Sequence, residues 1–320
     1  MNFIKSIIGE ELLTFEKKFE NSVKSNIPLL DRVMKYIIKR KGKQLRPMFV
    51  FLSAKLHGDI NESTYRAAAL VEMLHTATLV HDDVVDESYE RRGFFSINAL
   101  WKNKIAVLVG DYLLSKGLLL STTHKEYTHL DIMSDAVRKM SEGELLQIEK
   151  SRNLNLDEKV YFEIIENKTA SLLSAACGIG AFSTTQNETT TNRMKLFGEK
   201  VGIAFQIKDD LFDYGSEKIG KPTGNDIQER KLTLPLIYTL NKVDKQTARQ
   251  LVYIIKNKNR DKEKVAIVIA EVIKAGGILY ATNKMNAYRD EAIAILHEFD
   301  ETPVRNALEG LVRYTTDRKY

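Results

Sequence analysis

The chain has few of the residues that break helices or cross-link a fold. Its 320 residues include 17 glycines, 5 prolines and a single cysteine, Cys177. Scarce glycine and proline favour long helices over a many-turned β architecture. One cysteine cannot form an intrachain disulfide, which fits a reducing cytosol. Cys177 itself, in the stretch LLSAACGIGAF, is expected to be a small buried apolar residue.

Long apolar runs and charged tails are also missing. No run of about twenty apolar residues suggests a membrane span, and the first residues, MNFIKSIIGEELLTFEKKF, predict an amphipathic helix rather than a signal peptide. The net charge is +5, with acidic and basic residues interleaved. No basic stripe with aromatic platforms occurs, which argues against a nucleic-acid partner. We expect a cytoplasmic protein.

Helical periodicity covers most of the chain. RAAALVEMLHTATLVHDDVVDE, residues 66–87, is apolar almost all round and has no breaker, so it predicts a central buried helix. Residues 103–121, 194–215 and 278–299 show similar patterns. The β-branched run VAIVIAEVI could form a strand locally, but its flanks indicate helix. We find no repeat and no linker, and therefore predict one all-α domain over residues 1–320.

Two aspartate clusters of the form DDxxD lie far apart in the chain. They are Asp82, Asp83 and Asp86, and Asp209, Asp210 and Asp213. The first and last aspartates of each cluster share one face of a helix, so each pair could hold one divalent ion. Carboxylates suit Mg²⁺, which often binds together with substrate phosphates. One such cluster could be a solvated face. Two copies inside apolar helices predict a cage for a magnesium–diphosphate complex, because buried carboxylates are costly without cations.

Basic residues gather at the helix boundaries near these clusters. Each alone is more often a surface cation, but together they indicate two polyphosphate sites, one using metal and one using basic side chains. Backbone N–H groups at a helix entry, as after GKQLRP, also favour anions. The basic residues are Lys43, Arg46, Arg91, Arg92, Lys168, Lys208, Lys218, Lys221 and Lys231.

The order of these motifs identifies a family. From GKQLRP through HDDVVDESYERRG and NKTA to QIKDDLFDYG and GKPTGNDIQERKLTLP, the chain resembles the trans-isoprenyl diphosphate synthases over essentially its whole length. The first acidic segment and the following RRG are most similar to long-chain bacterial members, such as octaprenyl diphosphate synthase. The resemblance implies an all-α bundle around a deep central cavity, usually a homodimer. It also implies magnesium-dependent head-to-tail condensation of isopentenyl diphosphate onto an allylic diphosphate.

The resemblance also implies roles for individual residues. Asp82 and Asp86, supported by Asp83, would bind magnesium on the allylic diphosphate. Asp209 would complete the metal cage, with Asp210 and Asp213 behind it. The allylic diphosphate would be held by Arg91, Lys168 and Lys221. Isopentenyl diphosphate would be held by Lys43, Arg46, His75 and Arg92.

The remaining roles concern the reacting centre. Thr169 and Gln206 would offer oxygen atoms to the developing cation, with Lys208 beside them and Lys231 among the cations that bind substrate. Gln147 stands where short-chain members commonly carry an aspartate that assists the metal. Long-chain relatives also tend to carry glutamine there, so the difference does not threaten activity. The hydrophobic product implies transient membrane contact.

Product length should depend on the residues just before the first cluster. Thr78 and Ala77 lie four and five positions before Asp82, and both are small. In the family that this chain resembles, bulky aromatic residues at these two positions form a floor of the product cavity. That floor stops the product at fifteen or twenty carbons. Each helical turn of about 5.4 Å matches about one isoprene unit, so an open face predicts about thirty to forty carbons, as in quinone side chains.

Other readings remain open at this point. Phe49, Phe51, Met133 or Val137 could provide a floor from a neighbouring helix, although ordinary core packing explains each equally well. A farnesyl or geranylgeranyl diphosphate synthase is the alternative within the class. A non-catalytic partner subunit would typically lose one acidic cluster. A terpene cyclase should lack the isopentenyl diphosphate site.

Overall fold

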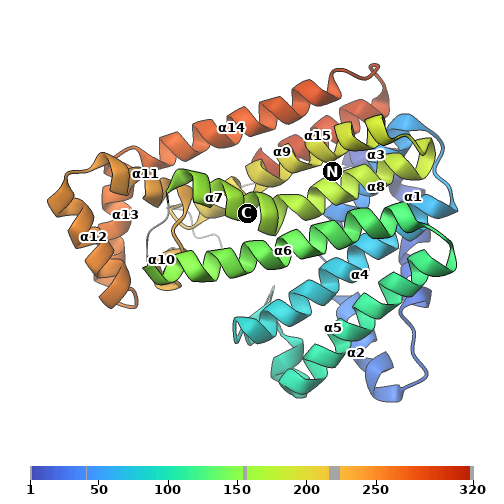
Figure 1. The fold of residues 1–320 in the computed structure, drawn as a ribbon, viewed down its shortest axis with the longest axis horizontal. Coiled ribbons are helices and arrows are strands. Elements are labelled where there is room, and N and C mark those ends of the chain that lie inside the picture. The colour runs from blue at the N-terminus through green and yellow to red at the C-terminus, as the bar shows by residue number, and fades with distance from the viewer. Residues whose placement is uncertain (1, 41, 92, 154–156, 216–223, 318–320) are drawn as a thin grey trace. The chain divides into compact units, whose positions relative to one another are not determined.

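The structure is almost entirely helical. This computed structural model describes residues 2–40, 42–91, 93–153, 157–215 and 224–317. Within these ranges the only strands are the two-residue β1 (Glu90–Arg91) and β2 (Phe94–Phe95), which pair antiparallel. The predicted all-α fold is therefore confirmed. The helices (Figure 1) are α1 Asn2–Ser22, α2 Pro28–Lys39, α3 Leu45–His57, α4 Glu62–Val85, α5 Ile97–Thr123, α6 Tyr127–Asn153, α7 Glu158–Ile165, the π-helical turn η1 Glu166–Ala170, α8 Ser171–Thr185, α9 Glu188–Phe212, α10 Asn225–Gln228, α11 Leu234–Lys242, α12 Lys245–Asn257, α13 Lys262–Lys274, α14 Gly277–Leu296 and α15 Pro303–Asp317.

Two compact units are assembled from separate stretches of the chain. Unit 1 comprises Met1–Val137, Leu172–Lys195 and Glu301–Leu308, and unit 2 comprises Arg138–Ser171, Leu196–Asp300 and Glu309–Tyr320. The helices α6, α9 and α15 each run from one unit into the other, so the division does not fall at a linker. The expectation of one domain over residues 1–320 stays a prediction.

Helix α4 belongs to unit 1, and 12 of its 24 residues are buried. It begins where the Asn61 side chain accepts a hydrogen bond from the Thr64 N–H (3.2 Å), while the Thr64 hydroxyl accepts one from the Asn61 N–H (3.3 Å). This reciprocal cap satisfies N–H groups that the first turn leaves open, and it starts the helix four residues before the predicted position. Helices α1, α3 and α5 all pack on α4, and α5 runs beside it (Figure 1).

The other predicted helices form, with different ends. The stretch 194–215 lies largely in α9, 278–299 in α14 and 103–121 in α5. Lys102 has φ 72° and ψ 159°, so α5 is interrupted there, just before the predicted start. The β-branched run lies inside α13, so its helical flanks outweighed its local strand preference. Cys177 is fully buried, as predicted, and burial raises the pKa of its thiol to about 12.

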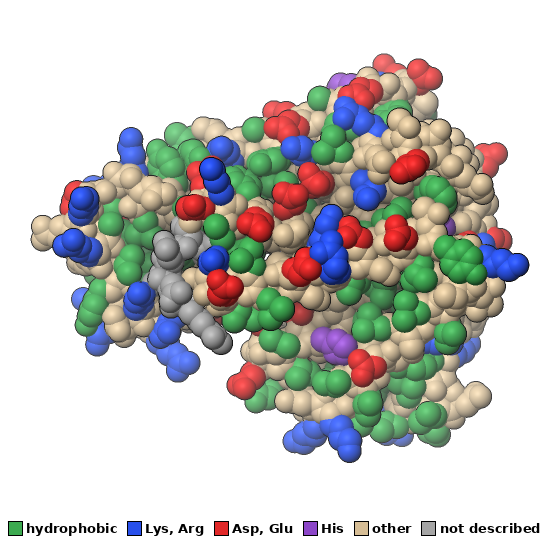
Figure 2. All heavy atoms as spheres, viewed as in Figure 1, with side chains coloured by type: hydrophobic (Ala, Val, Ile, Leu, Met, Phe, Trp, Pro, Cys, Tyr) green, Lys and Arg blue, Asp and Glu red, His purple; other side chains and the backbone are tan. Residues whose placement is uncertain are grey.

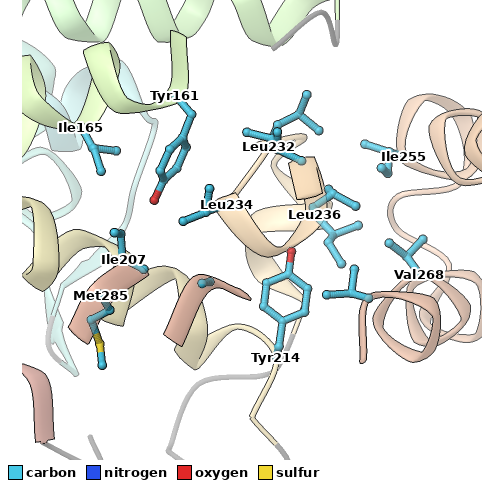
Figure 3. Close-up of a cluster of buried hydrophobic side chains, with 14 of the residues drawn as sticks. Tyr161, Ile165, Ile207, Tyr214, Leu232, Leu234, Leu236, Ile255, Val268 and Met285 are labelled. Atoms are coloured by element: carbon cyan, nitrogen blue, oxygen red, sulfur yellow. The ribbon is translucent and has the colours of Figure 1, made fainter. Parts of the chain in front are cut away.

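Unit 2 has its own apolar core. Side chains from α7, α9, α11, α12, α13 and α14 meet there, including Leu234, Leu236, Ile255 and Val268, each nearly or completely buried. Figure 3 shows the phenol rings of Tyr161 and Tyr214 among these side chains. A tyrosine buried in an apolar cluster needs a partner for its hydroxyl, and both tyrosines have one. The partner of Tyr161 belongs to the second aspartate cluster.

Candidate active site

The first aspartate cluster lies at the C-terminal end of α4. Asp86 follows the last helical residue, and its N–H bonds the Asp82 carbonyl at 2.8 Å, which keeps the helical spacing of these two residues. Asp86 is exposed and Asp82 is half-buried. The end of a helix carries partial negative charge, so two carboxylates there favour a bound cation. This pair therefore fits a divalent ion that takes its other oxygens from water or substrate phosphate.

Asp83 has a different environment from its two neighbours. Its side chain is buried and accepts a hydrogen bond from the Arg91 Nε at 2.7 Å. The Asn98 side chain also donates to the Asp83 carbonyl at 3.0 Å. Burial raises the pKa of Asp83, and Arg91 opposes that shift. Asp83 thus anchors the β1–β2 hairpin to α4, and Arg91, predicted to bind substrate, is paired with it in this structure.

The predicted isopentenyl diphosphate residues begin at the entry to α3. Gln44, the residue before this helix, has φ 53° in the left-handed region, an uncommon conformation that recurs at functional sites. Lys43 is exposed and Arg46 is half-buried, while His75 on α4 is buried. All three belong to unit 1. Arg92, Lys218 and Lys221 lie outside the described residues.

In the second aspartate cluster, at the end of α9, two of the carboxylates accept hydrogen bonds from other groups of the protein. Asp210 accepts hydrogen bonds from the Tyr161 hydroxyl at 2.7 Å and the Gln206 Nε2 at 2.9 Å. Asp213 accepts one from the Asp226 N–H at 3.2 Å, at the start of α10. Burial raises the pKa of Asp210 to about 6. Asp209 is the half-buried member of the cluster.

Asp226 is an acidic neighbour that the sequence reasoning missed. Burial raises its pKa to about 7, and the charges of Asp210 and Asp213 add to the shift, while Lys231 opposes it. Its one sequence signal is an acid five residues before Lys231, in NDIQERK. Across the described ranges, no three His, Cys, Asp or Glu side chains form a group that could hold a metal by themselves.

Lys168 and Thr169 lie on the π-helical turn η1. A Cβ atom added at Gly143 of α6 would lie 2.8 Å from the Lys168 backbone nitrogen, and one at Gly202 of α9 would lie 2.5 Å from the Ala170 Cα. Two glycines thus let η1 pack closely against both helices. π-Helical turns are rare and often mark functional sites, and no sequence pattern indicated this one.

The side chains of Lys168 and Thr169 make polar contacts with α6 and α9 respectively. Lys168 is ion-paired with Glu144, and its Nζ lies 3.4 Å from the Gln147 Oε1. The Thr169 hydroxyl donates to the Gln206 Oε1 at 2.8 Å. The structure therefore brings two of the predicted cation-stabilising residues into direct contact. Lys208 places its ammonium group 5.2 Å from the centre of the Phe212 ring, and Lys231 is ion-paired with Glu229.

The predicted chain-length residues lie on α4. Ala77 is fully buried, and the half-buried Thr78 donates to the His75 carbonyl at 2.9 Å. Phe51 packs edge-on against Phe15 and Tyr65, which is ordinary core packing. Of the other floor candidates, Phe49 and Met133 are fully buried and Val137 is half-buried.

Comparison with known proteins decides the family. A model of the polyprenyl synthetase family matches residues 27–272. The chain belongs to the polyprenyl synthetase family. It is 33% identical to octaprenyl diphosphate synthase of Escherichia coli (strain K12), over 98% of both chains. It is also 33% identical to geranylgeranyl diphosphate synthase of Saccharolobus solfataricus, over 94% of both chains.

Solved structures agree with this assignment. The crystal structure of a polyprenyl synthase from Caulobacter crescentus CB15, complexed with calcium and isoprenyl diphosphate, matches with a TM-score of 0.92 and 31% identity. It covers 100% of this chain and 98% of that one. As a member of the polyprenyl synthetase family, the protein is a prenyltransferase that acts on isoprenyl diphosphates. The resemblance drawn from the motifs is therefore confirmed.

Proposed function

We propose that this protein is a long-chain all-trans polyprenyl diphosphate synthase that makes quinone side chains of about thirty to forty carbons, one isoprene unit for each open turn of α4. The observation that carries the chain length is the small size of Ala77, five residues before Asp82 on α4, and of Thr78 beside it. Neither is bulky enough to stop a growing chain. Equal identity to an octaprenyl and a geranylgeranyl synthase keeps the shorter product as the alternative.

A product assay tests this proposal. The protein is incubated with farnesyl diphosphate, labelled isopentenyl diphosphate and Mg²⁺, and the dephosphorylated products are sized. A ladder ending at about thirty to forty carbons supports the long-chain function. A stop at fifteen or twenty carbons makes the alternative correct. No elongation would point to a non-catalytic partner subunit despite both intact clusters.

Ala77→Tyr tests the path of the product. A phenol ring one turn before Asp82 would block the face of α4 that we assign to the tail, so the longest product should shorten to about fifteen to twenty carbons. Ala68→Tyr is the matched control, because Ala68 is also fully buried but lies nine residues, about two and a half turns, before Ala77. An unchanged product length in Ala77→Tyr would place the tail elsewhere.

Magnesium is the metal that the site suits best. Asp82 and Asp86 would hold one ion on the allylic diphosphate, and Asp209, with Asp210 and Asp213 behind it, would complete the metal site. Bound magnesium supplies positive charge that stabilises the departing diphosphate. Two carboxylates and a diphosphate match the preference of Mg²⁺ for a few protein ligands with water and phosphate oxygens.

The reaction then needs no catalytic dyad. Arg91, Lys168 and Lys221 would hold the allylic diphosphate while its C–O bond breaks. The double bond of isopentenyl diphosphate, held by Lys43, Arg46, His75 and Arg92, would supply the electrons of the new C–C bond. The oxygens of Thr169 and Gln206 would face the allylic cation, and the departing diphosphate would take the proton that is lost. Lys208 and Lys231 would add positive charge near the leaving group.

We assign the enzyme to the cytoplasm as a homodimer. By length and composition alone, α5 is the one helix among the described residues that could cross a membrane. Only 33% of its apolar 18-residue stretch is buried in the structure. One side of α5 packs along α4 within unit 1, and the other side is exposed. We favour a second copy of this chain as the partner that covers the exposed side. The exposed apolar residues of α5 are Leu100, Val107, Leu108, Leu118 and Leu119.

A further inference from the structure

A continuous chain of hydrogen bonds joins Tyr161 to Thr169 within unit 2. The Tyr161 hydroxyl is 2.7 Å from the Asp210 Oδ2, the Gln206 Nε2 is 2.9 Å from the Asp210 Oδ1, and the Thr169 hydroxyl is 2.8 Å from the Gln206 Oε1. The chain thus crosses from α7 through α9 to η1. Its first member is 4% exposed and its central carboxylate is 6% exposed.

The direction of donation in this chain follows from its central member. An ionised carboxylate has no proton to give, so both Tyr161 and the Gln206 amide nitrogen donate to Asp210. The Gln206 carbonyl oxygen must then face Thr169, whose hydroxyl donates to it. A hydroxyl has one proton. With that proton committed to Gln206, the Thr169 oxygen has only lone pairs left for a ligand.

We propose that Tyr161 is a positioning residue that acts through Asp210 and Gln206 to present the lone pairs of Thr169, and not its proton, to the allylic cation. This inference rests on the proposed function. Without the Tyr161 hydroxyl, Asp210 loses one of its donors and holds the Gln206 amide less firmly. An amide that turns over would offer Thr169 its nitrogen, and the Thr169 proton would be free to point at the cation.

Tyr161→Phe and Tyr214→Phe make a matched pair of variants. Both tyrosines lie in the same apolar cluster (Figure 3), at 4% and 5% exposure, and each hydroxyl has a side-chain partner. The partner of Tyr214 is the Thr233 hydroxyl at 2.6 Å, which has no part in the chain to Thr169. A purely structural effect should appear equally in both variants.

Binding of two unreactive ligands gives the decisive measurement. One is a thiolo analogue of the allylic diphosphate, and the other carries an ammonium group at the position of the cation. We expect Tyr161→Phe to weaken binding of the ammonium analogue about tenfold relative to binding of the thiolo analogue. Only the ammonium analogue carries a positive charge that responds to whether Thr169 presents lone pairs or a proton. Tyr214→Phe should leave that ratio unchanged. An unchanged ratio in Tyr161→Phe would overturn the proposal.

Turnover provides a second, independent check. If Tyr161 acts through Thr169, Tyr161→Phe should lower kcat in the wild type and have no further effect in a Thr169→Val background. Additive losses would overturn the positioning role. If the wild type binds neither analogue, the proposed function itself fails, which is a different result from an unchanged ratio.

A second inference comes from the distribution of charge. Of 48 basic and 43 acidic residues, nine and four lie in residues 242–274, which leaves 39 of each sign in the rest of the chain. The whole net charge of +5 therefore belongs to α12, α13 and their flanks. Figure 2 shows charges of both signs over the visible face, with mainly blue side chains over α12 and α13.

The basic side chains of this hairpin are available for binding. All nine are exposed, and within the described part of the chain only Lys274 has an ion-pair partner, Glu271. Two of the four acids, Asp244 and Asp261, cap the N-termini of α12 and α13. Exposed apolar side chains stand among the cations, at Tyr253, Ile267 and Ile273.

We infer that the α12–α13 hairpin docks on an anionic lipid surface. Lipid headgroups of negative charge attract basic clusters on helices, and exposed apolar side chains suit the boundary of a bilayer better than a nucleic acid. This inference does not depend on the chemistry of the active site. It places the enzyme where a hydrophobic product could enter a membrane.

Vesicle flotation without substrate tests the docking surface. Wild type should bind phosphatidylglycerol vesicles and not phosphatidylcholine vesicles, and 0.5 M salt should release it. Replacing Lys256, Lys258, Arg260 and Lys262 by Gln should weaken binding at least about tenfold. The charge-matched control replaces exposed lysines of unit 1, namely Lys5, Lys17, Lys24 and Lys125. Equal losses in both variants, no vesicle binding, or stronger binding to duplex DNA than to vesicles would overturn the inference.

Discussion

The two aspartate clusters have the same spacing but different surroundings. In the first, Asp82 and Asp86 stand at the open end of α4, and Asp83 alone is buried, with a salt bridge to Arg91. In the second, Asp210 and Asp213 are both buried and hold protein donors. A DDxxD pattern therefore specifies which carboxylates share a helix face and does not specify which of them are buried.

This difference separates two kinds of carboxylate. Those of the first pair lie where a helix end already carries negative charge, which favours a bound cation. Those of the second cluster satisfy buried N–H and O–H groups, so they contribute to the fold. Substitutions in the two clusters should therefore affect turnover and stability in different proportions.

The largest expected effect is on turnover in Asp82→Ala. Removing one of the two carboxylates that we propose as ligands of the metal should lower kcat by about 1000-fold or more. The fold should remain intact, since Asp82 is a half-buried side chain at a helix end. Steady-state kinetics and thermal unfolding of the same preparation would measure both. Near-normal activity in a folded variant would sink the metal assignment.

Glu126 provides a half-buried carboxylate outside both clusters. It accepts two hydrogen bonds from Arg66, at 2.9 and 2.6 Å. Burial acts to raise its pKa, but hydrogen bonds from His129 and Arg66 lower it to about 2.

The folded pKa of Glu126 lies below its ordinary value of 4.5, so its stabilisation is present above pH 4.5 and is lost as the pH falls toward 2. The stabilisation that Glu126 contributes to the free energy of unfolding is about 3 kcal/mol. Denaturant unfolding from pH 6 to 2.5 should show this loss, and Glu126→Gln should flatten the curve. Parallel curves for the two proteins would exclude Glu126 as its source.

Asp210→Asn should destabilise the fold, whereas Asp82→Ala should leave the fold intact. An asparagine keeps the shape but turns one N–H₂ group toward donors that now lack an acceptor, which costs about 2 kcal/mol. Asp86→Asn, at the exposed member of the first pair, is the matched control and should change the unfolding free energy by no more than about 0.5 kcal/mol. Equal stability of the two asparagine variants would remove the distinction between the clusters.

The sequence predicted the helical fold for physical reasons that the structure confirms. Few glycines and prolines, together with the apolar pattern of residues 66–87, specify long buried helices. The ends were less predictable because they depend on local bonds, such as the Asn61–Thr64 cap. The pattern could place the aspartates on one helix face because the helical period alone determines that relation.

Other parts of the site depend on packing across helices. The π-helical turn forms where Gly143 and Gly202 allow close approach, and neither glycine adjoins it in sequence. Asp226 becomes significant only because folding brings its loop to Asp213. Tyr161 likewise meets Asp210 from 49 residues away. A single sequence holds no local signal for such contacts.

The smallest expected effect is a gain in stability in Asp86→Ala. Because this exposed carboxylate lies at the negative end of α4, its removal should stabilise the metal-free protein by about 0.5 kcal/mol. For a chain of this size the unfolding midpoint should rise by about 1 °C. Calorimetry in a chelating buffer would measure the shift, with Glu87→Ala as a neighbouring control. Addition of magnesium and an allylic diphosphate should reverse the order of wild type and variant, since only the wild type keeps both ligands. A lower midpoint without metal would mean that Asp86 supports the fold, as Asp210 does, and the contrast between the clusters would then lie in Asp82 alone.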